Sequence, residues 1–126
     1  MTAIASIDIG TNTIRMIIYE IGPNGELHEM NSERAIVRLG EGIDRKRRLL
    51  PHRVDQAIGV LQGFVETCRK HGNVSIHAVA TSAVREAQNR EEFLGPVRTD
   101  LGLEIKVIPW EEEARLTLKG VFWKIH

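Results

Sequence analysis

Two apolar runs, residues 4–9 and 14–21, lie so close together that only a tight turn fits between them. Each run is rich in Ile and too short for an independent helix, so both are predicted to be strands. The segment Gly22-Pro23-Asn24-Gly25 predicts a second turn, and residues 26–39 predict a third, more polar strand near a sheet edge. Three strands with such short links favour an antiparallel meander.

The rest of the chain alternates helices with strands. The predicted elements are a helix from Pro51 to Gly72, a strand at 74–80, a turn at 81–85, a helix at 89–101, a strand at 103–108 and a helix from Glu111 toward Trp123. Gly95-Pro96 is a point at which the second of these helices can break or kink. Alternation of this kind implies right-handed crossovers and parallel pairing. The expected fold class is therefore α/β, with a mixed sheet of three antiparallel strands followed by parallel strands and covering helices.

Composition limits the classes of function. The chain has 126 residues, about the length of one domain, with no internal repeat or linker, so residues 1–126 are predicted to form a single domain. Its 17 basic and 17 acidic residues give no overall attraction to nucleic acid or an anionic membrane. No stretch approaches the roughly 18 apolar residues of a membrane span, and no signal peptide is evident.

The single cysteine, Cys68, excludes an internal disulfide framework and favours a reducing, cytoplasmic setting. Cys68 also falls on the apolar face of its predicted helix, which is typical of a buried core thiol rather than a nucleophile. The five histidines show no metal-ligand spacing.

The turn between the first two strands carries the residues best suited to chemistry. Gly10, Thr11, Asn12 and Thr13 can present clustered backbone N–H groups and side-chain donors, a combination that suits a phosphate group. Asp8, at the end of the first strand, can hold a hydrated Mg²⁺ beside that phosphate. An ordinary β-turn would use the same residue types for local turn chemistry, so the pattern alone leaves both interpretations open.

At this point the sequence resembles a known family. IDIGTNTIRMII looks like the first phosphate loop of the actin, sugar kinase and 70-kDa heat-shock ATPase superfamily. Three further segments resemble the Ppx/GppA exopolyphosphatase and guanosine pentaphosphate phosphohydrolase family and occur in the same order. They are RLGEGID at 38–44, AVATSAVREAQNREEFL at 78–94 and EEEARLTLKGV at 111–121. The resemblance implies a ribonuclease H-like (actin-like ATPase) domain. It also implies an N-terminal lobe, because the family's second phosphate loop, of the DIGGGSTE type, is absent.

The resemblance assigns roles to residues near the ends of two strands. Glu113 matches the glutamate that activates water, with the adjacent Glu112 as the fallback, although acidic residues at a helix start are also favoured by the helix dipole. Arg85 matches the arginine of a TSALRE-like segment and can clamp phosphate, or instead pair with Glu86. Thr81 and Ser82 can donate to phosphate or cap a helix. Pro109-Trp110 replaces the family's Ser-Gly, so an indole near the cleft can alter substrate fit.

The expected function is hydrolysis of a terminal phosphoanhydride, with Mg²⁺ as cofactor and inorganic polyphosphate or guanosine pentaphosphate as substrate, the latter linking the protein to the stringent response. The second lobe of the same chain would be required, and this part alone is expected to have low activity. An exposed half-interface can also make it self-associate as a homodimer. The alternatives are an ATP-dependent kinase of the same superfamily and a non-catalytic sensor of polyphosphate or an alarmone.

Arg45-Lys46-Arg47-Arg48 is the only basic run. Most such runs are solvated loops, but this one can also steer a long polyanion toward the cleft, an effect that salt would weaken.

Overall fold

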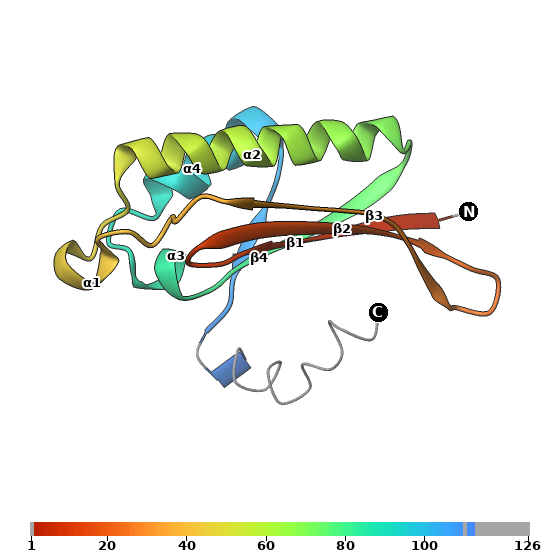
Figure 1. Cartoon of the computed structure of the whole chain (residues 1–126), viewed down its shortest axis with the longest axis horizontal. Helices are drawn as coiled ribbons and strands as arrows, with labels where there is room; N and C mark the ends of the chain where they lie inside the picture. The colour runs from red at the N-terminus through yellow and green to blue at the C-terminus, as the bar shows by residue number, and fades with distance from the viewer. Residues whose placement is uncertain (1, 110, 113–126) are drawn as a thin grey trace.

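A computed structural model describes residues 2–109 and 111–112, and its centre is one five-stranded mixed sheet. The strands lie in the order β3-β2-β1-β4-β5, and α2 and α4 cover the same face of the sheet (Figure 1). The element bounds are β1 Thr2–Ile9, β2 Thr13–Ile21, β3 Leu27–Ile36, α1 Ile43–Lys46, α2 Pro51–Lys70, β4 Val74–Ala80, α3 Ser82–Glu86, α4 Glu91–Leu101 and β5 Ile105–Val107.

The first three strands form the predicted antiparallel meander. β1 pairs with β2 from Thr2 opposite Ile21 to Ile9 opposite Ile14, and β2 pairs with β3 with one irregularity after Ile18. β3 is the edge strand and most of its side chains are exposed, which confirms the interpretation of its polar sequence. It ends at Ile36 rather than at residue 39, because the amides of the next two residues turn away to bond the β1–β2 turn.

The helix α2 carries the chain from the antiparallel to the parallel part of the sheet. Pro51 occupies its first turn, where a missing N–H costs nothing, and Val54, Leu61 and Cys68 lie on its buried face. After α2 the chain enters β4, which runs parallel to β1 with Ile9 opposite Ala80. The C-terminal ends of β1 and β4 therefore meet at one end of the sheet.

Further elements differ from the sequence predictions. Residues 82–86 form the short helix α3, where the sequence predicted a turn. Residues 43–46 form the short helix α1, which includes the first half of the basic run whose usual interpretation is a solvated loop. Both are too short to show a helical period. Of the two outcomes left open at Gly95-Pro96, a break does not occur, since α4 continues through Pro96 to Leu101. β5 covers only Ile105–Val107 of the predicted 103–108. Helical structure begins at 111–112, and the rest of the predicted last helix lies outside the described residues.

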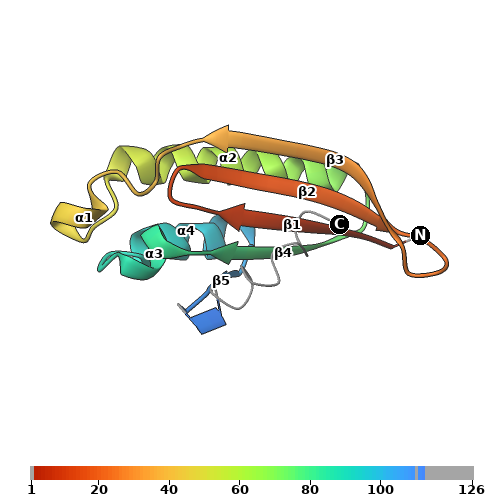
Figure 2. The same ribbon diagram turned by 60° about the horizontal axis from the view of Figure 1, so that its bottom comes forward.

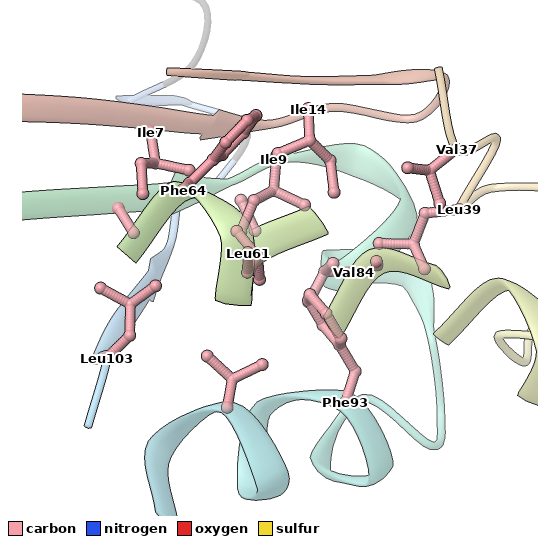
Figure 3. Close-up of a cluster of buried hydrophobic side chains, with 14 of the residues drawn as sticks. Ile7, Ile9, Ile14, Val37, Leu39, Leu61, Phe64, Val84, Phe93 and Leu103 are labelled. Carbon is pink, nitrogen blue, oxygen red and sulfur yellow. The ribbon is translucent and has the colours of Figure 1, made fainter. Parts of the chain in front are cut away.

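A single hydrophobic core lies between the sheet and its helices (Figure 3). Ile7, Ile9 and Ile14 project from the sheet toward Leu61 of α2 and Phe93 of α4, and each is at most 1% exposed. Because side chains alternate along a strand, the neighbours of these isoleucines lie on the opposite face of the sheet. That alternation places Asp8 on the face away from α2.

Candidate functional site

The residues predicted to bind phosphate gather at one end of the sheet. The β1–β2 turn follows β1, and Thr81 and Ser82 follow β4, which lies beside β1 in parallel register. Figure 2 shows α1, α3 and the β1–β2 turn together at this end. The carboxyl ends of parallel strands in open α/β sheets are where ligands usually bind.

The β1–β2 turn is fixed mainly through its carbonyl groups. The Gly10 amide donates to the Thr13 carbonyl at 3.0 Å and closes the hairpin. The carbonyl of Thr11 accepts a hydrogen bond from the Gly40 amide at 2.9 Å, and that of Asn12 accepts two from the residues that follow β3. Within the described residues, the amides of Thr11 and Asn12 donate no hydrogen bond. The Gly10 amide is thus already used inside the hairpin, while two of its neighbours keep amide hydrogens for another group.

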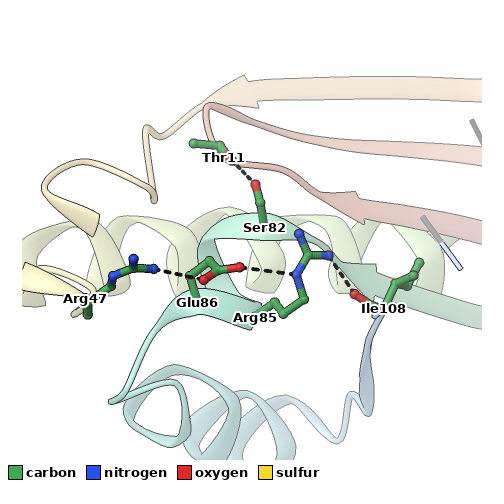
Figure 4. A network of polar contacts seen from close by, with 6 residues as sticks. All are labelled: Thr11, Arg47, Ser82, Arg85, Glu86 and Ile108. Carbon is green, nitrogen blue, oxygen red and sulfur yellow. Dashed lines mark hydrogen bonds and ion pairs between the residues drawn. The ribbon is translucent and has the colours of Figure 1, made fainter. Parts of the chain in front are cut away.

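The turn is joined to α3 by a hydrogen bond between two predicted site residues. Thr11 Oγ1 and Ser82 Oγ lie 2.7 Å apart (Figure 4). Only one hydroxyl hydrogen can lie between two oxygens, so the other hydroxyl can donate elsewhere. The contact therefore leaves one of the two predicted donors able to reach a phosphate oxygen.

Thr81 holds the start of α3 through its main chain. Its amide donates to the Ile9 carbonyl at 3.3 Å, and its carbonyl accepts from the Arg85 amide at 3.0 Å. Thr81 occupies the N-cap position of α3, yet its side chain makes no capping hydrogen bond. Ser82 is the first residue of the helix rather than its cap.

Arg85 is held by neighbours on both sides. Its Nη1 donates to the carbonyl of Ile108 at 2.9 Å, and its Nε lies 3.6 Å from Glu86 Oε1. Glu86 also accepts from Arg47 Nη1 at 3.0 Å, so α1, α3 and the end of β5 are linked by one polar network (Figure 4). The ion pair with Glu86, which the sequence left open as an alternative, is present. With 11% of its side chain exposed, Arg85 presents a guanidinium whose position is set by the fold.

A depression of about 400 Å³ lies between α4 and β5, and Arg85 forms part of its wall. Its other lining residues are Arg90, Glu91, Leu94, Arg98, Ile105, Val107 and Pro109. Pro109 is the first residue of the Pro109-Trp110 pair that the sequence analysis singled out. Trp110 lies outside the described residues.

The carboxylates predicted to bind metal or act in catalysis lie in different surroundings, and one of them lies outside the described residues. Asp8 is exposed at the end of β1, with Arg15 of β2 as its register partner. No group of three or more His, Cys, Asp or Glu able to hold a metal occurs among residues 2–109 and 111–112. A single protein carboxylate is compatible with Mg²⁺, because this ion commonly takes one or two carboxylates together with substrate phosphates and water. Glu112 accepts from Lys106 Nζ at 3.2 Å, and Glu113 lies outside the described residues.

Sequence reasoning missed two residues that shape this end of the molecule. A Cβ on Gly40 would come within 2.3 Å of Thr11 Cγ2 and 3.3 Å of Ala83 Cβ, so only glycine allows this approach. Asn89, 9% exposed, bonds the main chain of Leu49 twice, at 2.7 and 3.0 Å. The RLGEGID match was the only signal for Gly40, and nothing local to Asn89 indicated its role.

The strand order, the mixed pairing and the helices on the sheet define a domain of the ribonuclease H-like, actin-like ATPase class. The model of the Ppx/GppA phosphatase family matches residues 17–126, and the chain belongs to that family.

Curated relatives cover the chain almost completely. It is 36% identical to exopolyphosphatase 2 of Mycobacterium tuberculosis over 128 residues, which is 95% of this chain and 40% of that protein. It is 32% identical to exopolyphosphatase 1 of Mycobacterium bovis, over 91% of this chain and 33% of that protein. The chain thus spans well under half the length of these relatives.

Solved structures also match most of this chain and less than half of their own length. A Ppx/GppA family member from Aquifex aeolicus matches with a TM-score of 0.85 and 35% identity, over 90% of this chain and 37% of that one. An exopolyphosphatase from Cytophaga hutchinsonii matches with a TM-score of 0.86 and 30% identity, over 91% and 36%. No helix in the described part of the chain is long and apolar enough to cross a membrane.

Proposed function

We propose that this chain is the N-terminal lobe of a two-lobed phosphatase that removes the terminal phosphate from inorganic polyphosphate or guanosine pentaphosphate. The observation that carries the proposal is the meeting of Thr11 and Ser82 at the shared end of β1 and β4, with Arg85 fixed on the same short helix. Family membership and relatives named exopolyphosphatase support the same reaction.

In this reaction a water oxygen attacks the terminal phosphorus, and the bridging P–O bond to the next phosphate breaks. Glu113 takes the proton from the water, and the products are orthophosphate and a chain one phosphate shorter. The proposed partners of the phosphate oxygens are the amides of Thr11 and Asn12, the hydroxyls of Thr11 and Ser82, and the guanidinium of Arg85. Gly10 contributes through its small size, because a Cβ there would lie 3.1 Å from the Thr13 carbonyl oxygen.

Asp8 would hold Mg²⁺ together with water and substrate oxygens. When bound, the ion would offset the negative charge that develops on the phosphate oxygens. The second lobe would supply the other half of the phosphate cradle, so the isolated lobe is expected to release phosphate slowly.

The test is phosphate release from polyphosphate by the full-length protein, with Mg²⁺ titrated. Glu113→Gln should lower kcat by about 10²–10⁴-fold, the usual contribution of a general base. Glu111→Gln, the same change two residues away on an exposed side chain, is the matched control and should leave kcat near that of the unchanged protein. Near-normal turnover of Glu113→Gln would remove Glu113 from this role.

The same protein separates the alternatives. A panel of polyphosphate, guanosine pentaphosphate and ATP with a phosphate acceptor distinguishes hydrolysis from phosphoryl transfer. Tight binding of polyphosphate without phosphate release would instead support a sensor. A 126-residue chain as active as the full-length protein would contradict the two-lobed site.

A further inference from the structure

Five exposed cations lie along the segment that connects β3 to α2, and three of them, Arg38, Arg45 and Lys46, are called the cationic rim below. Within the described part of the chain, their side chains make no hydrogen bond or ion pair. The other two arginines of the basic run do make ion pairs, Arg47 with Glu86 at 3.0 Å and Arg48 with Glu92 at 3.6 Å. The run therefore divides into two residues engaged with the domain and two directed to solvent.

The backbone that carries the rim is held firmly. The Arg38 amide donates to the Asn12 carbonyl at 2.9 Å, so Arg38 lies directly beside the β1–β2 turn. At the other end, the Arg47 carbonyl accepts from the Gln88 amide at 2.7 Å, and Asn89 bonds both main-chain groups of Leu49. Ile43 and Leu49 are buried in the core. The segment is thus anchored to the domain at both ends, so the backbone positions from which its cationic side chains project are fixed.

The segment also contains two residues with an uncommon backbone conformation. Arg38 and Arg47, with φ of 59° and 56°, are the only non-glycine residues with positive φ among residues 2–109 and 111–112. Glycine adopts this conformation with less strain, and strain of this kind concentrates at functional sites. Arg47 uses its side chain to bond Glu86. The exposed Arg38 side chain makes no such contact in the described part of the chain.

The acidic neighbours of the rim are largely neutralised by other groups. Glu41 accepts from Arg53 at 2.8 Å and lies 3.4 Å from His52, while Glu86 and Glu92 are paired with the arginines already described. The hydrogen bond and charge of Arg53 hold the pKa of Glu41 below its usual value, so Glu41 stays ionised and paired. Asp44, which precedes Arg45, is the only acidic residue beside the rim that has no cationic partner in the described part of the chain. The rim therefore keeps an excess of positive charge.

We infer that the cationic rim binds the internal phosphates of a polyphosphate chain whose terminal phosphate lies at the β1–β2 turn. This inference rests on the proposed function and selects between its two substrates. A polyphosphate carries charge along its whole length, so its chain can pass from the turn to Arg38 and on to Arg45 and Lys46. A guanosine nucleotide carries only short phosphate groups, and gains less from cations farther from the turn.

The test uses the full-length protein and compares long-chain polyphosphate with inorganic triphosphate. Arg45→Gln/Lys46→Gln should raise the KM for the long chain about three- to tenfold at low salt, the range expected for two exposed charge contacts, and should raise the KM for triphosphate less. The salt dependence of the long-chain KM should also become shallower, since fewer counterions are released on binding. Arg69→Gln/Lys70→Gln removes the same charge from the far end of α2 and is the matched control.

Arg38→Gly gives a second variant that should fold, since glycine suits the positive φ at this position. It should raise the long-chain KM without loss of stability. Equal KM values in the two charge-deleted proteins, or equal increases for long and short substrates, would overturn the inference. If the unchanged protein releases no phosphate, the proposed function fails. In that case the Kd of long-chain polyphosphate, measured for the same variants, tests separately whether the rim binds polyphosphate. A Kd equal to that of the unchanged protein would overturn the inference.

Discussion

The hydroxyl oxygens of Thr11 and Ser82 lie 2.7 Å apart, although 71 residues separate them in the sequence. This contact joins the turn after β1 to the helix after β4 at the end where those parallel strands meet. It brings two residues predicted independently as phosphate ligands into one site.

Removing either hydroxyl should weaken this junction. Thr11→Val and Ser82→Ala should each lower the free energy of unfolding by about 0.5–1.5 kcal/mol, because each leaves a partly buried hydroxyl without its partner. In a double-mutant cycle measured by urea denaturation, the two changes should not be additive. Ser75→Ala, which removes an exposed hydroxyl bonded to His77 on β4, is the control and should change stability by less than about 0.5 kcal/mol. Additive effects of Thr11→Val and Ser82→Ala would show that the contact is not energetically coupled.

Gly40→Ala should destabilise the domain by about 1–3 kcal/mol, since the new methyl group would overlap Thr11 Cγ2 and press on Ala83. Thr11→Ser removes Cγ2 and keeps the hydroxyl, so adding it to Gly40→Ala should recover part of the loss. Gly63→Ala is the matched control, because nothing lies within 4 Å of a Cβ there. That exposed helical position should instead gain about 0.5–1 kcal/mol. Equal effects at the two glycines would refute the close approach of this loop to the turn.

Asn89→Ala should lower the free energy of unfolding by about 1–3 kcal/mol, because it leaves the buried amide and carbonyl of Leu49 without partners. The exposed Asn73→Ala serves as the control. Hydrogen exchange of the Leu49 amide should also become faster in the Asn89 variant. Unchanged protection of that amide would mean that another group holds the loop.

Cys68 should be protected from thiol reagents in the folded protein. Cys68 is 2% exposed, and burial, with a smaller contribution from the Glu33 carboxylate, raises the pKa of its thiol. An aromatic disulfide reagent at pH 8 should therefore modify it only after unfolding in urea. Rapid modification of the native protein would contradict the burial.

The same pKa shift predicts a loss of stability in alkali. The thiol of the unfolded chain ionises at about pH 8.5. The contribution of Cys68 is fully present below that pH and is lost as the pH rises through the higher folded pKa, because the unfolded state releases its proton first. The free energy of unfolding should fall over this range, and Cys68→Ala should show a shallower fall. Identical slopes for the two proteins would exclude the effect.

The sequence by itself determined the main elements of the fold. Strand-length apolar runs, the strong turn after β2, Pro51 at the start of α2 and the polar pattern of β3 each have a local physical cause. Those causes act through neighbours along the chain, so the order of elements and the mixed sheet could be predicted. The spacing of Asp8, Gly10 and Thr11 also gave a prediction of where chemistry would lie. The place of Ser82 at a strand end and the family match at Arg85 added two candidates, which stay predictions.

The tertiary structure alone decided how these residues meet. Three contacts join segments that are distant in the sequence: Thr11 with Ser82, Gly40 with Thr11, and Asn89 with Leu49. The sequence also suggested the Gly10 amide as a phosphate donor, but pairing within the hairpin engages it. Hydrogen-bond partners and close packing depend on the positions of several elements at once. A local pattern can therefore name the groups that form the site, and only the folded chain determines which of them face one another.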